Sequence, residues 1–210
     1  KPLLKFERLL ETYLDNSPFG IQSFSKSMPI WSQEKIFQKQ NIFSYLKEID
    51  REFNDIQKIQ FVEHHISHAA SAFYPSPFED AIILTADGVG EWATTTVAIG
   101  NKNNLEMQKE INYPHSLGLI YSAFTYYCGF KVNDGEYKLM GLAPYGDPKY
   151  FNLILDKLMD IKEDGSFRMN QYYFDYSTGL RMINKKFEKL FGMKSRDINS
   201  THIDQFYMDI

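Results

Sequence analysis

The spacing of apolar and polar residues divides the first quarter of the chain into two helices and a loop. In KPLLKFERLLETYL, residues 1–14, apolar side chains recur on one helical face with charges opposite, which predicts an amphipathic helix. The segment 15–32 contains two prolines, a glycine and several serines, so we expect a packed loop there. Ser32 is a capping residue, and a second helix is expected from it to about Phe53.

Beyond Phe53 the pattern alternates between strands and helices, which indicates an α/β organisation. The apolar run Ala-Ile-Ile-Leu favours a buried strand, and the segments that follow it favour two returning antiparallel strands. The strands expected are 57–63, 81–86, 93–99, 105–111 and 167–174. The helices expected are 66–74, 117–128, 136–142, 149–160 and 180–191.

Composition places the chain among globular proteins. Hydrophobic residues make up 43% and charged residues 24%, and the net charge of −4 gives no global attraction to nucleic acid or anionic lipid. The single cysteine, Cys128, cannot form an intramolecular disulfide, and no signal peptide or membrane-spanning stretch is present. We expect a cytoplasmic protein that binds neither membrane nor nucleic acid. Because the chain starts at Lys1 and stops at Ile210 within a helical pattern, we expect an excerpt of a longer protein.

Two histidines and an aspartate are the strongest candidates for chemistry. His64 and His68 stand four residues apart in a helical run, which puts both imidazoles on one face as a shared metal ion requires. Asp87 follows the strand 81–86 and should lie at its carboxyl end, where open α/β sheets place ligands. Two imidazoles and one carboxylate suit a catalytic iron, zinc or manganese ion. His65 points to another face, where a hydrogen bond is its simplest role.

Three further segments have a functional and a structural interpretation. Gly88 and Gly90 allow backbone amides to approach an anion, or they serve a tight hairpin through positive φ. His115 precedes Ser116, the expected cap of the helix 117–128, so it is either a proton shuttle or a neighbour of the cap. The segment GEYKLMGLAPYG forms a packing helix, or it places Lys138 on a phosphate and Gly141 beside a ligand. Composition alone favours packing for this last segment.

Five ordered blocks of sequence resemble the nodulation-type O-carbamoyltransferases, a family that includes antibiotic carbamoyltransferases. The blocks are KPLLKFERLLETYL, EHHISHAASAFYPSPF, LTADGVGEWATTT, PHSLGLIYSAFTYYCGFKVNDGEYKLMGLAPYGDP and FDYSTGL. The resemblance implies an actin-like, ribonuclease-H-like ATPase (ASKHA) fold, with a mixed sheet flanked by helices that is incomplete here. Within one partial N-terminal domain it implies a helical portion (1–56), a metal and nucleotide core (57–160) and a truncated segment (161–210). It also implies a second domain, which forms carbamoyl adenylate and is expected outside residues 1–210.

The resemblance also implies roles for particular residues. The metal ligands would be His64, His68 and Asp87, with a further aspartate beyond Ile210. The contacts to ATP or carbamoyl adenylate would be Gly88, Gly90, Glu136, Lys138 and Gly141. The implied reaction makes carbamoyl adenylate from carbamoyl phosphate and ATP. A metal ion, with Fe²⁺ preferred over Zn²⁺ or Mn²⁺, polarises the carbamoyl carbonyl while a hydroxyl of a sugar or other small molecule attacks. His65 or His115 would take the proton.

Two other functions compete with this one. Paired helical histidines also occur in metallopeptidases, but HHISH lacks the glutamate that HExxH requires beside its first histidine. The second alternative is a non-catalytic fragment that binds a nucleotide, a metal or a partner surface. The excerpt alone is expected to be inactive, and the sequence leaves the acceptor and the oligomeric state open.

Overall fold

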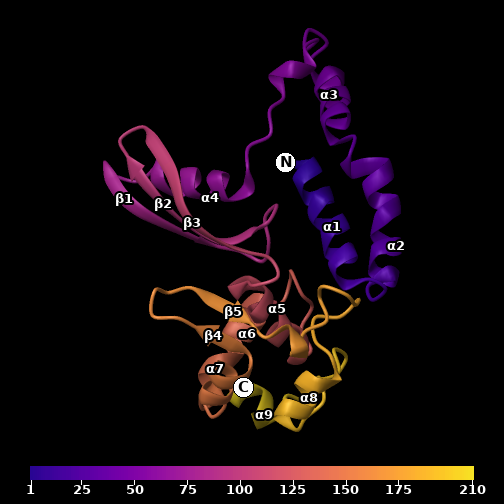
Figure 1. The fold of residues 1–210 in the computed structure, drawn as a ribbon, viewed down its shortest axis with the longest axis vertical. Helices are drawn as coiled ribbons and strands as arrows, with labels where there is room; N and C mark the ends of the chain where they lie inside the picture. The colour runs from indigo at the N-terminus through magenta and orange to yellow at the C-terminus, as the bar shows by residue number, and fades with distance from the viewer.

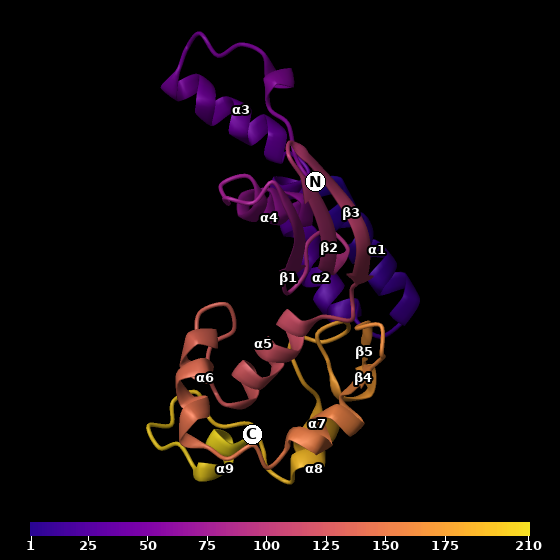
Figure 2. The same ribbon diagram turned by 90° about the vertical axis from the view of Figure 1, so that its left-hand side faces the viewer.

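A computed structural model describes residues 1–210 as helices packed around two small sheets. The helices are α1 (Pro2–Asn16), α2 (Ile21–Ile30), α3 (Gln38–Ile49), α4 (His64–Phe73), α5 (Leu117–Tyr127), α6 (Glu136–Leu142), α7 (Phe151–Lys157), α8 (Lys185–Phe191) and α9 (Gln205–Asp209). The strands are β1 (Asp80–Ala86), β2 (Ala93–Asn101), β3 (Asn104–Asn112), β4 (Met159–Ile161) and β5 (Phe167–Met169). Helices α1 to α4 and strands β1 to β3 form one half, and α5 to α9 with β4 and β5 form the other (Figures 1 and 2). None of the helices is long and apolar enough to cross a bilayer.

The larger sheet has the antiparallel order β1-β2-β3, and α4 lies against one of its faces (Figure 2). Ala69 and Phe73 of α4 pack on Ile83 and Ala98 to form a buried cluster. Gly100 has no side chain because a Cβ there would lie 2.6 Å from the Phe73 ring. The three expected strands of this sheet are therefore confirmed.

The other face of β1 is open. Ile82 is 79% exposed and Leu84 is 69% exposed, whereas Ile83 and Thr85 are buried on the α4 side. The expectation of a fully buried strand at 81–86 is wrong, because β1 is an edge strand covered on only one face. Every strand pair in residues 1–210 is antiparallel, so the expected mixed sheet is not present in this chain.

The second half has an aromatic core. Tyr127 and Phe187 are fully buried, and their ring centroids lie 5.2 Å apart in an edge-to-face arrangement. They belong to a larger cluster drawn from α5, α8 and the segments around β4 and β5. Cys128 is buried beside Leu142 and Tyr207, and burial raises the pKa of its thiol to about 12. A buried thiol with a raised pKa is rarely in the reactive thiolate form.

Several expected element boundaries are wrong. The segment 15–32 is largely helical because α2 packs on α1, with Tyr13 and Phe24 stacked at a centroid distance of 4.5 Å. This packing outweighs the helix-breaking tendency of Pro29, and a π-helical turn at Trp31–Lys35 follows. The expected strand at 57–63 is absent, because no neighbouring strand pairs with it and the Asp55 side chain starts a 3₁₀ turn instead.

In the C-terminal third the elements are shorter than expected. The helix expected at 149–160 ends at Lys157, because Met159–Ile161 pairs with Phe167–Met169 as a short hairpin. The strand expected over 167–174 is confirmed only as β5. Helix α8 begins at Lys185, where the side chain of Asn184 caps it.

Candidate metal site

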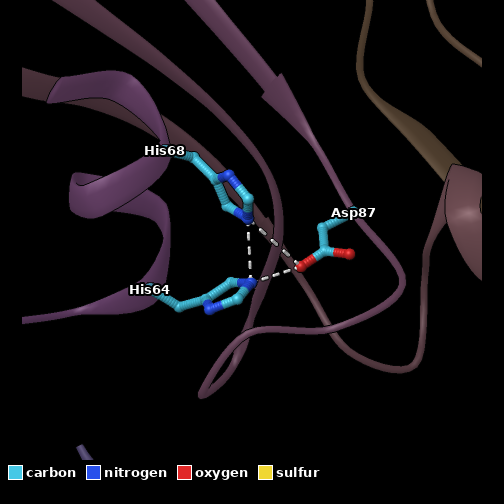
Figure 3. Close-up of side chains that lie close together, drawn as sticks. All are labelled: His64, His68 and Asp87. Atoms are coloured by element: carbon cyan, nitrogen blue, oxygen red, sulfur yellow. Dashed lines mark hydrogen bonds and ion pairs between the residues drawn. The ribbon is translucent and has the colours of Figure 1, made fainter. Parts of the chain in front are cut away.

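The side chains of His64, His68 and Asp87 converge on one point (Figure 3). His64 Nε2 lies 2.5 Å from Asp87 Oδ2 and 3.0 Å from His68 Nε2, and His68 Nε2 lies 3.8 Å from Asp87 Oδ2. Ligand atoms about 2.1 Å from a shared ion lie about 3–3.5 Å from one another. The structure thus brings together the three residues that the sequence proposed as ligands, hereafter the candidate metal site.

Local folding explains this convergence. The first turn of α4 carries His64 and His68 on one helical face, while His65 turns toward the sheet and is 4% exposed. Packing of α4 across β1 brings that first turn beside the end of the strand, where Asp87 begins the connection to β2. The two histidines and the aspartate remain partly accessible, with exposed fractions of 34%, 51% and 34%.

Hydrogen bonding alone satisfies this cluster poorly. Both short contacts of His64 use the same nitrogen, Nε2, which carries at most one hydrogen. If His64 donates to Asp87, it must share that hydrogen with His68. One divalent cation would instead accept a lone pair from each of the three atoms, and the donor set of two imidazoles and a carboxylate fits zinc, iron or manganese.

The carboxylate of Asp87 is oriented and ionised. Its Oδ1 accepts the Gly88 N–H at 2.6 Å, which leaves Oδ2 for the histidines. Partial burial acts to raise the pKa of Asp87, but the Gly88 amide and His64 outweigh it, so the pKa lies below its ordinary value. An ionised carboxylate is the form that binds a metal ion.

His65, a candidate base, lies between α4 and the sheet. Its Nδ1 is hydrogen-bonded to Thr85 Oγ1 at 2.6 Å, and Thr85 is bonded in turn to Thr96 at 2.7 Å. Burial is the main cause that lowers the pKa of His65, so the neutral imidazole is favoured. The structure gives this side chain a packing environment rather than a place among the ligand atoms.

His115, the other candidate base, lies away from the candidate metal site. Its Nδ1 accepts the Met169 N–H at 3.0 Å, which ties the loop before α5 to β5. It borders a cavity of about 580 Å³ between β3 and the β4–β5 hairpin, and that cavity includes Arg168 but no candidate ligand. Burial and, to a lesser extent, Arg168 lower the pKa of His115.

The glycine loop uses its amides internally. The Gly88 N–H donates to Asp87, and the Gly90 N–H donates to the Ala93 carbonyl at 2.9 Å. Neither glycine has positive φ, so the hairpin interpretation based on φ is wrong. Gly90 instead meets a packing requirement, because a Cβ there would lie 2.9 Å from His65 Cδ2.

The nucleotide candidates of α6 lie in the other half of the molecule from α4 (Figure 2). Glu136 accepts hydrogen bonds from the Asn133 N–H and from Ser122, so its carboxylate is engaged locally. Lys138 is exposed, with Nζ 5.7 Å from the centroid of the Tyr137 ring, and the space around Gly141 is open. No hydrogen bond or ion pair joins these residues to the candidate metal site.

Three residues support the site in ways that the sequence did not predict. Arg8 of α1 donates to the carbonyls of Gly90 and Glu91 at 2.8 and 2.7 Å, and Glu91 accepts the His64 N–H at 2.9 Å. Ser116, expected only as the cap of α5, also donates to the carbonyls that follow β1. The DGVGEW motif and the cap were visible in the sequence, but nothing there paired Arg8 with a loop 82 residues away.

Comparison with known proteins identifies relatives along the whole chain. The family model described as carbamoyltransferase N-terminus matches residues 1–205. An uncharacterised protein of Synechocystis, sll1178, is 58% identical over 100% of this chain and 34% of its own length. Nodulation protein NolNO of Sinorhizobium fredii is 40% identical over 55% of this chain and 17% of its own length. NolO of Bradyrhizobium diazoefficiens is 34% identical over 52% of this chain and 20% of its own length. The chain therefore spans at most about a third of these relatives.

Proposed function

Because this chain belongs to the carbamoyltransferase family and its residues 1–205 match the family's N-terminal region, we propose that it supplies the metal-holding part of an O-carbamoyltransferase. In the reaction we propose, the carbamoyl group passes from carbamoyl adenylate, made from carbamoyl phosphate and ATP, to a hydroxyl of a small-molecule or sugar acceptor. The acceptor oxygen forms a bond to the carbamoyl carbon, AMP leaves, and the hydroxyl proton is released. The observation that carries this proposal is the convergence of His64, His68 and Asp87.

The chain's own residues would prepare the site in two ways. His64 and His68 present their Nε2 atoms from one helix face, and Asp87 adds an ionised oxygen from the end of β1. A bound divalent cation would supply Lewis-acid polarisation of a carbonyl. Neither His65 nor His115 lies among the three candidate ligand atoms, so the geometry favours neither of them as the base that takes the acceptor proton.

We also propose that these residues form part of an actin-like ATPase fold whose remainder lies in the longer protein. The antiparallel β1-β2-β3 sheet with a helix on one face is compatible with that architecture. Helix α6 is the proposed contact for the nucleotide, since Lys138 and Gly141 are accessible there.

A second candidate function is metal or nucleotide binding without turnover by residues 1–210 alone. The observation favouring it is that the chain spans only 34% of its 58%-identical relative. In that case the catalytic step requires the remaining part of the longer protein.

Carbamoyl transfer tests the main proposal. Full-length sll1178 from Synechocystis and this chain would each be incubated with metal, ATP, labelled carbamoyl phosphate and a panel of hydroxyl compounds. We expect label in an acceptor with the long protein only. The Asp87→Asn change, made by placing asparagine at the aligned position of sll1178, should reduce transfer by about 100-fold or more. The matched control places asparagine at the position aligned with Asp80, at the opposite end of β1. Transfer by the Asp87→Asn protein at the parental rate would contradict the proposal.

A further inference from the structure

The loop that begins at Asp87 is held by side chains that are not candidate ligands. Arg8 donates from one guanidinium nitrogen to the carbonyls of Gly90 and Glu91, at 2.8 and 2.7 Å. Because α1 is far away in sequence, this contact fixes the loop against a separate helix. The loop therefore has a defined position before any ligand binds.

Glu91 connects this loop to the histidine-bearing helix. Its Oε2 accepts the backbone N–H of His64 at 2.9 Å. The residue is 8% exposed, so its charge is shielded from water. The first N–H groups of α4 have no partner within the helix, and a carboxylate is favoured there by both hydrogen bonding and the helix dipole.

We propose that Glu91 is a positioning residue for the candidate metal site. Its carboxylate ties the first turn of α4 to the loop that starts at Asp87, so that His64 Nε2 and Asp87 Oδ2 meet. This inference rests on the proposed metal site but adds a residue that is not itself a ligand. Glu91 acts through the His64 backbone, because its Oε2 accepts the His64 N–H and neither of its oxygens lies among the ligand atoms of the candidate metal site.

Glu63 provides a matched control. It precedes His64 at the N-cap position of the same helix, yet its side chain makes no capping hydrogen bond. Its carboxylate is 44% exposed and pairs with the Lys1 side chain at 2.6 Å. Glu63→Gln and Glu91→Gln therefore both remove a negative charge from this end of the helix. Only a change at Glu91 alters the side chain that accepts the His64 N–H.

The experiment measures Co²⁺ affinity and the Co²⁺ absorption spectrum of the 210-residue chain and its variants. We expect Glu91→Ala to weaken Co²⁺ binding by about 10–100-fold and to change the spectrum. Glu91→Gln keeps an oxygen that can accept the His64 N–H, so it should recover most of the affinity and the parental spectrum. Glu63→Gln should bind like the parent.

The outcomes separate the positioning role from the metal site. His68→Ala serves as the reference for loss of a ligand. If His68→Ala loses binding while Glu91→Ala keeps parental affinity and spectrum, the positioning role is overturned and the metal site stands. If His68→Ala also binds like the parent, the proposed metal site fails and the positioning role with it. If Glu91→Ala does not fold, Glu91→Met takes its place, because it keeps most of the side-chain volume but has no oxygen to accept the His64 N–H. Weaker binding by Glu91→Met than by Glu91→Gln supports the proposal, and parental affinity and spectrum in Glu91→Met overturn it.

Discussion

Adjacent histidines in HHISH have different physical environments. His64 directs Nε2 toward Asp87 at the edge of the sheet, whereas His65 is buried and bonded to Thr85. The 100° step between neighbouring helix positions produces this difference. One imidazole is available to a ligand and the other holds α4 on β1.

Replacing His65 with alanine tests its packing role. The change removes a buried ring and the hydrogen bond to Thr85, so we expect it to lower the free energy of unfolding by about 2–4 kcal/mol. Urea unfolding measures the loss, and Ser67→Ala on the exposed side of α4 serves as a control with a change within about 0.5 kcal/mol. Equal unfolding midpoints for His65→Ala and Ser67→Ala would contradict the packing role.

For single residues, the sequence predicted which side chains share a helix face. It did not predict which side chains distant in sequence contact one another. The spacing of His64 and His68 is a local property of a helix, so their shared face could be predicted. The contacts of Arg8 and Glu91 depend on how α1 and α4 each lie against the loop after β1, which no local pattern specifies. The ligand candidates could therefore be found from sequence, while the side chains that hold them could not.

Helix α5 anchors the loop after β1 through its first turn. Ser116 accepts the Leu119 N–H as an N-cap, and its hydroxyl lies 2.8 and 2.7 Å from the carbonyls of Asp87 and Gly88. Gly118 allows this close approach, since a Cβ there would lie 2.5 Å from the Asp87 carbonyl oxygen. The cap was predicted from the sequence, but the approach of the helix to the loop was not.

Ser116→Ala should destabilise this junction. Loss of the cap and of a buried donor should lower the free energy of unfolding by about 1–3 kcal/mol. Amide hydrogen exchange at Leu119 should also accelerate, because its N–H loses its partner. Ser71→Ala is the control, since Ser71 is exposed and bonds only to the His68 carbonyl at 2.8 Å. Unchanged exchange at Leu119 would contradict the assignment.

Helix α9 is joined to the segment before α7 by a carboxylate. Asp209 accepts hydrogen bonds from the Lys149 side chain, Gln205 and the Asp147 N–H, which together lower the pKa of Asp209 to about 2. A lowered pKa means that ionisation favours the folded state. That contribution is fully present above the ordinary value of 3.8 and is lost as the pH falls through about 2.

Thermal unfolding at several pH values tests the Asp209 contacts. The melting temperature of the parent chain should exceed that of Asp209→Asn at pH 6, and the difference should shrink as the pH falls from about 4 to 2. Asp160→Asn is the control, because Asp160 is 59% exposed and pairs only with Lys162. A difference between parent and Asp209→Asn that stays constant with pH would contradict the assigned pKa.

Two halves with separate cores make up the whole molecule, and the candidate metal site lies in the first of them (Figures 1 and 3). The antiparallel sheet was predictable because strands 81–111 follow one another through short turns. The helical state of 21–30 and the absence of a strand at 57–63 depend on tertiary partners, so local patterns failed there. The open face of β1, with Ile82 and Leu84, is likewise a property of the assembled sheet.

The most direct test of the proposed metal site is metal stoichiometry by equilibrium dialysis followed by elemental analysis. We expect one Zn²⁺, Fe²⁺ or Mn²⁺ ion per chain, with affinity reduced at least about 100-fold by His64→Ala, a candidate ligand. His202→Ala should bind normally, since His202 is an exposed histidine outside the site. A chain that binds no divalent ion, or a His64→Ala chain that binds as tightly as His202→Ala, would contradict the shared site of His64, His68 and Asp87.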